Sequence, residues 1–381
     1  MKKLYFIISL IFIDLLLSQL FLLKILEREL VIANKESFEN RIFNKDYKYT
    51  FKEKVKFTSQ YDKKIYNIST NDLGFRDDNT SHLNRNKEYS VLIGDSFIEG
   101  VGLEYKDTIV GILNKKLENN QFKFLNAGVA SYSSYIYLKK IENIINRNKD
   151  LRIKDVIVFL DKSDVSDDEI YLDKPEYFKN TKGKFINQRR EDFSKDLKDL
   201  SLWRFYTKQT ISGKAIKLGT DQLEDFISNI NKRIIISRKL NKSFFNVTKL
   251  EIKAIKSINN KPHIRNWYQG KIWEQKTKNN IIFSIENLYL LKNFLDKKNI
   301  DLLVVLYPWS FEIDDKDIRE KYLEFITPLL KENNIEYVSV YSKFLEGNIY
   351  ENIGKFYFYN DIHFNRQGNK IIANQLIKKI N

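Results

Sequence analysis

Five short apolar runs alternate with helix-like patterns along this chain, and this alternation restricts the folds that it can adopt. The apolar runs are Tyr89–Ile93, Phe122–Leu125, Val156–Leu160, Leu302–Leu306 and Tyr337–Val340. The helical patterns are Thr108–Leu117, Tyr135–Ile145, Ile285–Leu295, Ile318–Leu330 and Gly368–Ile380. Apolar runs of this length are typical of strands buried on both faces of a parallel sheet. Their alternation with helices predicts an open, doubly wound α/β sheet.

One long segment, residues 166–280, interrupts this alternation between the third and fourth apolar runs. It carries many charges and several aromatic residues, and it contains helix-like stretches at Ser201–Lys217 and Gln222–Arg238. A structureless loop of that length would be unusual in a compact domain. We therefore predict a long, mostly helical insertion or cap that divides the α/β domain into residues 88–165 and 281–381.

The N-terminal segment, residues 1–30, is predicted to be a membrane anchor. Lys2 and Lys3 precede an almost wholly apolar stretch, residues 4–23, and about 20 such residues suffice to cross a bilayer. Cations before a span favour a cytoplasmic N-terminus. We therefore expect a single-pass protein of the inner membrane whose main domain is periplasmic. No small-residue cleavage pattern follows, which favours an uncleaved signal anchor over the alternative of a cleaved signal peptide.

Asp14 interrupts the predicted span. A carboxyl group in the middle of a membrane costs a few kcal/mol on insertion scales and usually has a partner. Two interpretations stay open: the group is protonated and tolerated, or it contacts another membrane helix.

Residues 31–87 are predicted to form a juxtamembrane extension before the α/β domain. The pattern favours a helix over residues 24–50, a strand at Tyr61–Ile68, and a turn at Asn71–Arg76 in which Gly74 is the flexible point.

The composition excludes some classes of site and partner. The chain has 381 residues and no cysteine, so it can form neither a disulfide nor a cysteine-based zinc site. Its net charge of +15 comes from lysines spread along the sequence, without the compact basic motif of a nucleic-acid reader. The charge reflects either lysine-rich codon usage or a surface suited to acidic polysaccharide or lipid headgroups. We predict no nucleic-acid partner, metal or cofactor.

The first apolar run ends in Gly94-Asp95-Ser96, which places a serine at the carboxyl end of a strand. Ligands bind at that edge of open α/β sheets. Glycine permits the sharp bend that such a turn needs. The hydroxyl of Ser96 could then act as a nucleophile while its backbone N–H binds an oxyanion.

A second polar motif, Asp361-Ile362-His363, lies near the C-terminus. Residues i and i+2 point to the same side only in extended or turn-like backbone, so Asp361 can reach His363 there but not on a helix. His363 would be the base for Ser96, and Asp361 would fix the tautomer of the imidazole.

These motifs together resemble those of the SGNH/GDSL hydrolase family, over residues 88–165 and 281–381. The resemblance implies a flavodoxin-like three-layer α/β/α fold with a parallel sheet of about five strands, and a serine nucleophile. It also implies oxyanion donors from two further motifs. The second motif is similar to Asn126–Ser131, where the family usually has glycine at the position of Ser131, the backbone donor. The third is similar to Asp161–Asp164, where Ser163 replaces an asparagine donor.

Two other segments, Asn71–Arg76 and Tyr307–Trp309, are similar to segments of membrane-anchored bacterial members of that family that act in polysaccharide pathways. The Asp-x-His form, with Asn360 where many members have their aspartate, is similar to the branch that includes periplasmic alginate O-acetylation proteins. For Tyr307 and Trp309, core packing and an aromatic platform for a sugar ring both stay open. Arg76 would either bind a substrate carboxylate or pair with a neighbouring aspartate.

We expect an extracytoplasmic serine esterase or O-acyltransferase that acts on acyl, above all acetyl, esters of a cell-envelope polysaccharide or glycolipid. Water as acceptor gives hydrolysis and a sugar hydroxyl gives transfer, and the sequence does not choose between them. The altered third motif keeps an alternative open: a catalytically weak or inactive polysaccharide-binding or assembly subunit with the same fold.

Overall fold

A computed structural model of the chain describes residues 2–17, 28–44, 46–61, 64–117, 122–164, 167–168, 211–259 and 266–380. The chain divides into two compact units. The first consists of residues 1–36 and 179–247, and the second of residues 37–178 and 248–381.

The first unit contains helix α1 (Lys2–Leu17), most of α3 (Arg28–Glu39) and the long helix α10 (Ile211–Lys239). The predicted helix Gln222–Arg238 lies within α10, whereas Ser201–Lys217 falls partly outside the described residues. In the described part of the chain, no helix is both long and apolar enough to cross a membrane. The predicted span 4–23 continues past the end of α1 into residues outside the described ranges.

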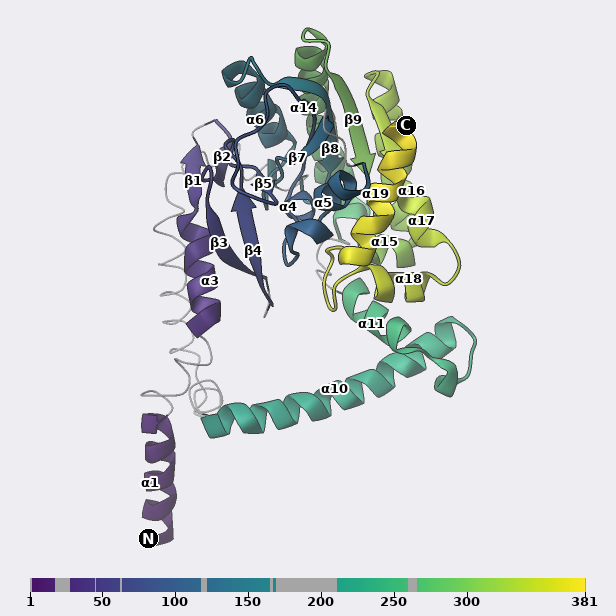
Figure 1. Ribbon diagram of the computed structural model, residues 1–381. Helices are drawn as coiled ribbons and strands as arrows, with labels where there is room; N and C mark the ends of the chain where they lie inside the picture. Colours follow the sequence, from purple (N-terminus) through teal and green to yellow (C-terminus); the bar gives the residue numbers. More distant parts are fainter. Residues whose placement is uncertain are drawn as a thin grey trace. The chain divides into compact units, whose positions relative to one another are not determined.

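The second unit is built on one sheet of eight strands (Figure 1). In chain order the strands are β3 (Lys56–Tyr61), β4 (Lys64–Thr70), β5 (Arg76–Asp77), β6 (Glu88–Ile93), β7 (Phe122–Asn126), β8 (Arg152–Leu160), β9 (Asp301–Leu306) and β10 (Glu336–Ser339). Their spatial order is β10-β9-β8-β6-β7-β5-β4-β3. The five strands from β10 to β7 are mutually parallel, which confirms all five predicted strands.

The parallel strands follow the doubly wound order of flavodoxin-like folds, with the first strand, β6, at the point where the order reverses. The predicted helices also form. They are α5 (Ile109–Lys116), α6 (Ser134–Arg147), α14 (Lys278–Asp296), α16 (Lys316–Glu332) and α19 (Arg366–Ile380). Helix α5 packs against α19, whereas α14 packs against both α6 and α16. Right-handed crossovers place these two groups on opposite faces of the sheet.

The predicted number of about five strands is too small for the whole sheet. Antiparallel strands β5, β4 and β3 extend it beyond β7. The predicted single strand Tyr61–Ile68 is only partly correct, since Tyr61 is the last residue of β3 and residues 64–68 belong to β4, the next strand. The predicted turn forms, with Gly74 at a φ of +69°.

The helix predicted over residues 24–50 is also only partly correct. Helix α3 ends at Glu39 and is followed by a separate two-stranded hairpin, β1 (Arg41–Asn44) and β2 (Lys48–Phe51). Short hairpin strands with exposed residues show no clear period of their own, so no sequence pattern marks the end of α3.

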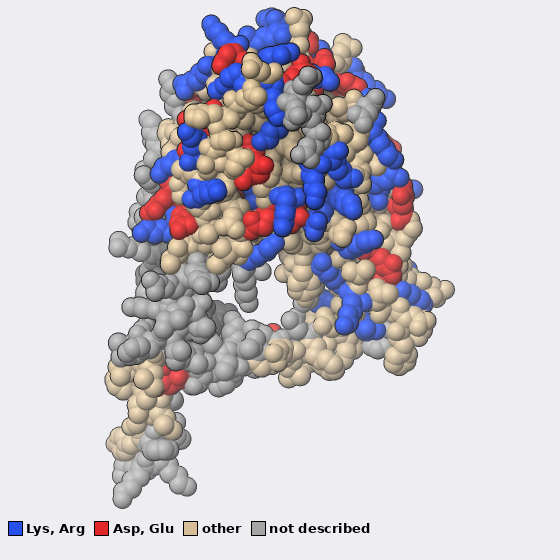
Figure 2. Space-filling model, viewed as in Figure 1, with Lys and Arg blue, Asp and Glu red and all other residues tan. Residues whose placement is uncertain are grey.

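The second unit also contains several shorter helices. They include α4 (Ser96–Glu99), α11 (Lys249–Ile258), α13 (Gly270–Ile272), α15 (Ser310–Asp314), α17 (Tyr341–Leu345) and α18 (Ile349–Phe356). Figure 2 shows lysine and arginine side chains scattered over one face of the molecule with aspartate and glutamate among them. The view agrees with the lysine distribution along the sequence.

Candidate active site

Ser96 is the first residue of the short helix α4, directly after the central strand β6. The Asp95 carboxylate caps this helix by accepting the backbone N–H of Phe97 at 3.0 Å. A side chain at Gly94 would collide with Ile98, since a Cβ there would lie 2.7 Å from that side chain. The tight glycine turn therefore brings α4 against the strand and places Ser96 at the carboxyl edge of the sheet.

His363 lies in the loop between α18 and α19, which folds back on itself. The N–H of Phe358 donates to the carbonyl of His363 at 3.0 Å, and Asn360 adopts a left-handed φ of +55°. Asp361 Oδ1 accepts both the backbone N–H of His363, at 3.0 Å, and its ring Nδ1, at 2.7 Å. The segment is thus a turn, as the spacing of two residues requires.

The structure brings Ser96, His363 and Asp361 together. Ser96 Oγ lies 2.8 Å from His363 Nε2, across 267 positions of sequence. With the Nδ1 proton donated to Asp361, Nε2 is the nitrogen that accepts from the serine hydroxyl. The His363 side chain is only 9% exposed, and its ring packs 4.6 Å from that of Phe97. This is the geometry of a general base poised on a nucleophile.

The electrostatics keep Asp361 ionised. Burial raises the pKa of its carboxyl group, but the hydrogen bonds and charge of His363, together with a hydrogen bond from Tyr61, outweigh burial and leave that pKa below its ordinary value. An ionised Asp361 holds the Nδ1 proton and stabilises an imidazolium. Burial and the nearby Asp161, by contrast, raise the pKa of Asp95, whose Oδ2 lies 3.1 Å from Ser96 Oγ.

Tyr61 is a site residue that the sequence did not indicate. Its hydroxyl lies 2.7 Å from His363 Nδ1, and its ring meets the imidazole edge-on with centroids 5.2 Å apart. No motif marks this tyrosine, which lies 302 positions from the histidine. Only the antiparallel extension of the sheet brings it there.

The second motif packs directly on helix α4. Asn126 Nδ2 donates to the carbonyl of Ile98 at 2.7 Å, and the N–H of Val129 donates to the carbonyl of Gly94 at 3.2 Å. Ser131 has a φ of +60°, the left-handed region that glycine adopts most readily. The backbone at Ser131 therefore has a conformation that suits glycine, the residue usual at this position in the family that the motifs resemble.

The predicted oxyanion role of the Ser163 side chain finds no geometric support. Its hydroxyl and its backbone N–H both donate to Asp161 Oδ1, at 2.6 and 2.7 Å. Because the serine side chain is short, its hydroxyl closes a local turn on Asp161 instead of reaching outward as an asparagine amide can.

The aromatic platform predicted from Tyr307 and Trp309 is also not formed. Both side chains are buried. The hydroxyl of Tyr307 and the indole N–H of Trp309 donate to Asp161 Oδ2 at 2.6 and 2.8 Å. The core-packing alternative is therefore the correct one, since these residues satisfy a buried carboxylate beneath the site.

Arg76 binds neither an aspartate nor an open site. It is buried, and its guanidinium donates to the carbonyls of Glu99 and Gly100 at 2.6 and 2.8 Å, and to that of Leu103. Arg76 thus fixes the loop that follows α4. Both predicted roles are wrong because backbone carbonyls, which no sequence pattern distinguishes, accept from the two terminal nitrogens Nη1 and Nη2.

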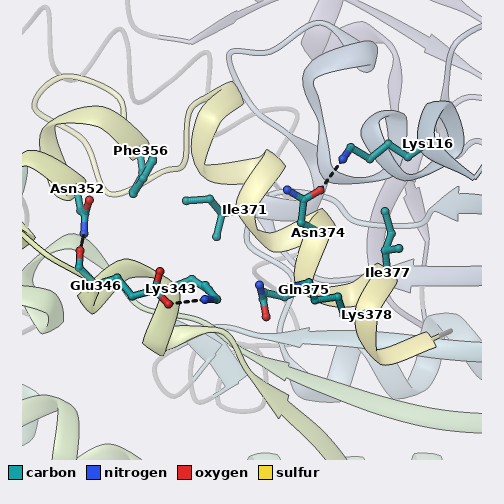
Figure 3. A pocket seen from close by; sticks show the side chains of 10 residues that line it. All are labelled: Lys116, Lys343, Glu346, Asn352, Phe356, Ile371, Asn374, Gln375, Ile377 and Lys378. Carbon is teal, nitrogen blue, oxygen red and sulfur yellow. Dashed lines mark hydrogen bonds and ion pairs between the residues drawn. The ribbon is translucent and has the colours of Figure 1, made fainter.

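Two other features lie apart from Ser96. A hollow of about 540 Å³ opens between α5, α17, α18 and α19 (Figure 3). Its lining includes Lys116, Lys343 and Lys378 but none of Ser96, Asp361 and His363. Within the described ranges, no group of three or more histidine, aspartate or glutamate side chains could hold a metal ion.

No protein-family model matches the sequence, and no curated protein matches it either. Among solved structures, the chain is similar to TesA, with 9% identity over 77% of this chain and 97% of that one and a TM-score of 0.39. It is also similar to a lipolytic protein of the G-D-S-L family from Veillonella parvula (13% identity, 76% and 97% covered, TM-score 0.36). A third similar structure is the esterase EstA from Pseudoalteromonas, with 10% identity over 77% of this chain and 96% of that one and a TM-score of 0.35. Of these three, the Veillonella parvula protein is the one described as a G-D-S-L family member.

Proposed function

We propose that this chain is a serine ester hydrolase or O-acyltransferase. The observation that carries the proposal is the aligned set of Ser96, His363 and Asp361, with contacts of 2.8 and 2.7 Å. Ser96 Oγ attacks the ester carbonyl carbon while His363 Nε2 takes its proton. The imidazolium then protonates the departing alkoxide, and the acyl group stays on Ser96.

The second half-reaction frees the enzyme. His363 takes a proton from water, or from a sugar hydroxyl, as that oxygen attacks the acyl carbon. The imidazolium then returns the proton to the departing Ser96 Oγ. The backbone N–H groups of Ser96 and Ser131 are the donors that we assign to the oxyanion. The Ser163 hydroxyl is omitted because it is engaged with Asp161.

We infer a substrate from the cell envelope: an acyl, above all acetyl, ester of a polysaccharide or glycolipid. This inference rests on the proposed membrane anchor at residues 4–23, which would place the site in the periplasm. Support comes from α1, where Leu10, Phe12 and Ile13 are each at least half exposed. Asp14 on the same helix is the proposed contact to a membrane partner. Alkaline-phosphatase and green-fluorescent-protein fusions after Asn381 test the topology, since only the former is active outside the cytoplasm.

A second candidate is a polysaccharide-binding or assembly subunit of low activity. It is favoured by the third motif, where the Ser163 hydroxyl donates to Asp161 and the Lys162 amine is engaged with Tyr307 and Glu312. Such a subunit would keep the fold and the triad but lack one oxyanion donor, whose loss costs up to about 3–4 kcal/mol of barrier.

A fluorophosphonate probe separates the two candidates, because it labels an activated serine whatever the substrate. We expect labelling of the full chain and hydrolysis of p-nitrophenyl acetate, both abolished in Ser96→Ala and retained in the surface control Ser81→Ala. Absence of both reactions in a folded wild-type chain would favour the binding subunit. Addition of an oligosaccharide acceptor then distinguishes transfer from hydrolysis by the product formed.

A further inference from the structure

The hydroxyl of Tyr61 occupies a position that the Ser96 mechanism does not by itself explain. It lies 2.7 Å from His363 Nδ1, the same nitrogen that lies 2.7 Å from Asp361 Oδ1. A hydrogen bond from Tyr61 also lowers the pKa of the Asp361 carboxyl group. One phenolic oxygen therefore contacts both partners of the histidine–aspartate pair.

The proton arrangement follows from the inventory of donors and acceptors. An ionised carboxylate only accepts, so the Tyr61 O–H proton goes to Asp361. The lone pairs of the Tyr61 oxygen then face Nδ1. An Nδ1–H can be shared between Asp361 and this oxygen, whereas a bare Nδ1 would confront lone pairs of Asp361. The arrangement therefore favours the tautomer in which Nε2 accepts from Ser96.

The surroundings of Tyr61 keep its ring in place. Tyr61 is the last residue of β3. Its ring Cδ1 lies 3.2 Å from where a Cβ at Gly102 would stand, and Gly102 has a φ of +74°. Arg76 fixes the same loop through the carbonyls of Gly100 and Leu103. A glycine thus leaves room for the tyrosine beside the histidine.

We propose that Tyr61 is a positioning residue for the catalytic pair, holding the Asp361 carboxylate and the His363 ring in the tautomer that activates Ser96. The proposal rests on the proposed ester chemistry for its effect on rate. The antiparallel extension of the sheet thereby contributes a side chain to the active site.

The test compares Tyr61→Phe, which removes one oxygen, with Tyr289→Phe, an exposed tyrosine on α14. The Tyr61 variant loses a hydrogen bond to a charged group, and such bonds contribute more than bonds between neutral groups. We therefore expect kcat for p-nitrophenyl acetate to fall about 10-fold to 100-fold in the Tyr61 variant with little change in KM. Tyr289→Phe should match the wild type.

A second readout does not depend on turnover. The proton between Nδ1 and Asp361 should give a far-downfield proton NMR signal, assigned by its loss in His363→Gln. We expect Tyr61→Phe to shift or broaden this signal in a chain whose circular dichroism is unchanged. An unaltered signal and an unaltered kcat would overturn the positioning role.

The two readouts also separate this proposal from the proposed function. If the wild-type chain hydrolyses no ester, the NMR signal alone decides the role of Tyr61. Should Tyr61→Phe fail to fold, Gly102→Ala provides the alternative, since the added methyl group presses on the Tyr61 ring and should perturb the same signal. A folded Gly102→Ala chain with the wild-type signal would count against the proposal.

Discussion

Arg41 on β1 and Glu99 on α4 form an ion pair, with Nη2 and Oε1 2.8 Å apart. Glu99 is fully buried, and its other oxygen accepts the N–H of Ala130 at 2.6 Å. The hydroxyl of Tyr49, on β2, donates to the carbonyl of Ala130 at 2.5 Å. The β1–β2 hairpin therefore holds the backbone that leads into Ser131, and the helix that begins with Ser96.

Arg41→Met should weaken this support. Removal of one partner from a buried pair costs up to about 3–5 kcal/mol, because the other charge stays buried without compensation; the partial exposure of Arg41 reduces this. We expect a large loss of unfolding free energy, measured by urea denaturation, and a fall in esterase activity. Arg152→Met, in a pair with Glu88 whose two side chains are both exposed, should cost at most about 1 kcal/mol. Equal effects of the two variants would contradict the structural role of Arg41.

The orienting carboxylate can be identified by two neighbouring substitutions. Asp361→Asn should lower kcat by a thousandfold or more, on the order seen when a triad aspartate loses its charge. Asn360→Gly should keep most of the activity, since glycine adopts the φ of +55° found at Asn360. Steady-state kinetics on a simple acetyl ester provide the measurement. A larger loss for Asn360→Gly would instead assign the critical role to Asn360.

The left-handed backbone at Ser131 gives a further prediction. Ser131→Gly should retain activity, since it keeps the backbone N–H and fits the φ of +60°. Ser131→Val should lower both the melting temperature and the activity, because left-handed backbone costs about 1–2 kcal/mol for residues with a Cβ and more for β-branched side chains. If valine and glycine behave alike, this backbone conformation does not matter for the site.

Lys140 should make stability depend on pH. Burial lowers the pKa of its amine to about 7. Between about pH 7.5 and 9.5 the unfolded chain binds a proton there and the folded chain does not, so the unfolding free energy rises with pH. In this range the unfolding free energy of the wild type should rise, relative to that of Lys140→Met, by up to about 1.4 kcal/mol per pH unit. Lys115→Met, at an exposed position, serves as the control. If the difference in unfolding free energy between the wild type and Lys140→Met does not change with pH, the Lys140 amine is not neutral in the folded chain.

Much of the fold could be predicted from local patterns. Strands buried on both faces leave continuous apolar runs, such as Tyr89–Ile93, and each parallel strand needs a crossover helix. The antiparallel strands were harder to place, because β3 and β4 combine buried and exposed residues and the connection between them carries no strong turn signal.

The sequence alone determined which residue types could do the chemistry. Gly94-Asp95-Ser96 after a buried run, and an aspartate two residues before a histidine, are local arrangements whose geometry follows from backbone periodicity. The tertiary structure decided the rest: the burial of Trp309, the carbonyl partners of Arg76, the turn of Ser163 onto Asp161, and the place of Tyr61 beside His363. These depend on contacts between distant segments and on backbone carbonyls, which every residue carries and no sequence pattern distinguishes.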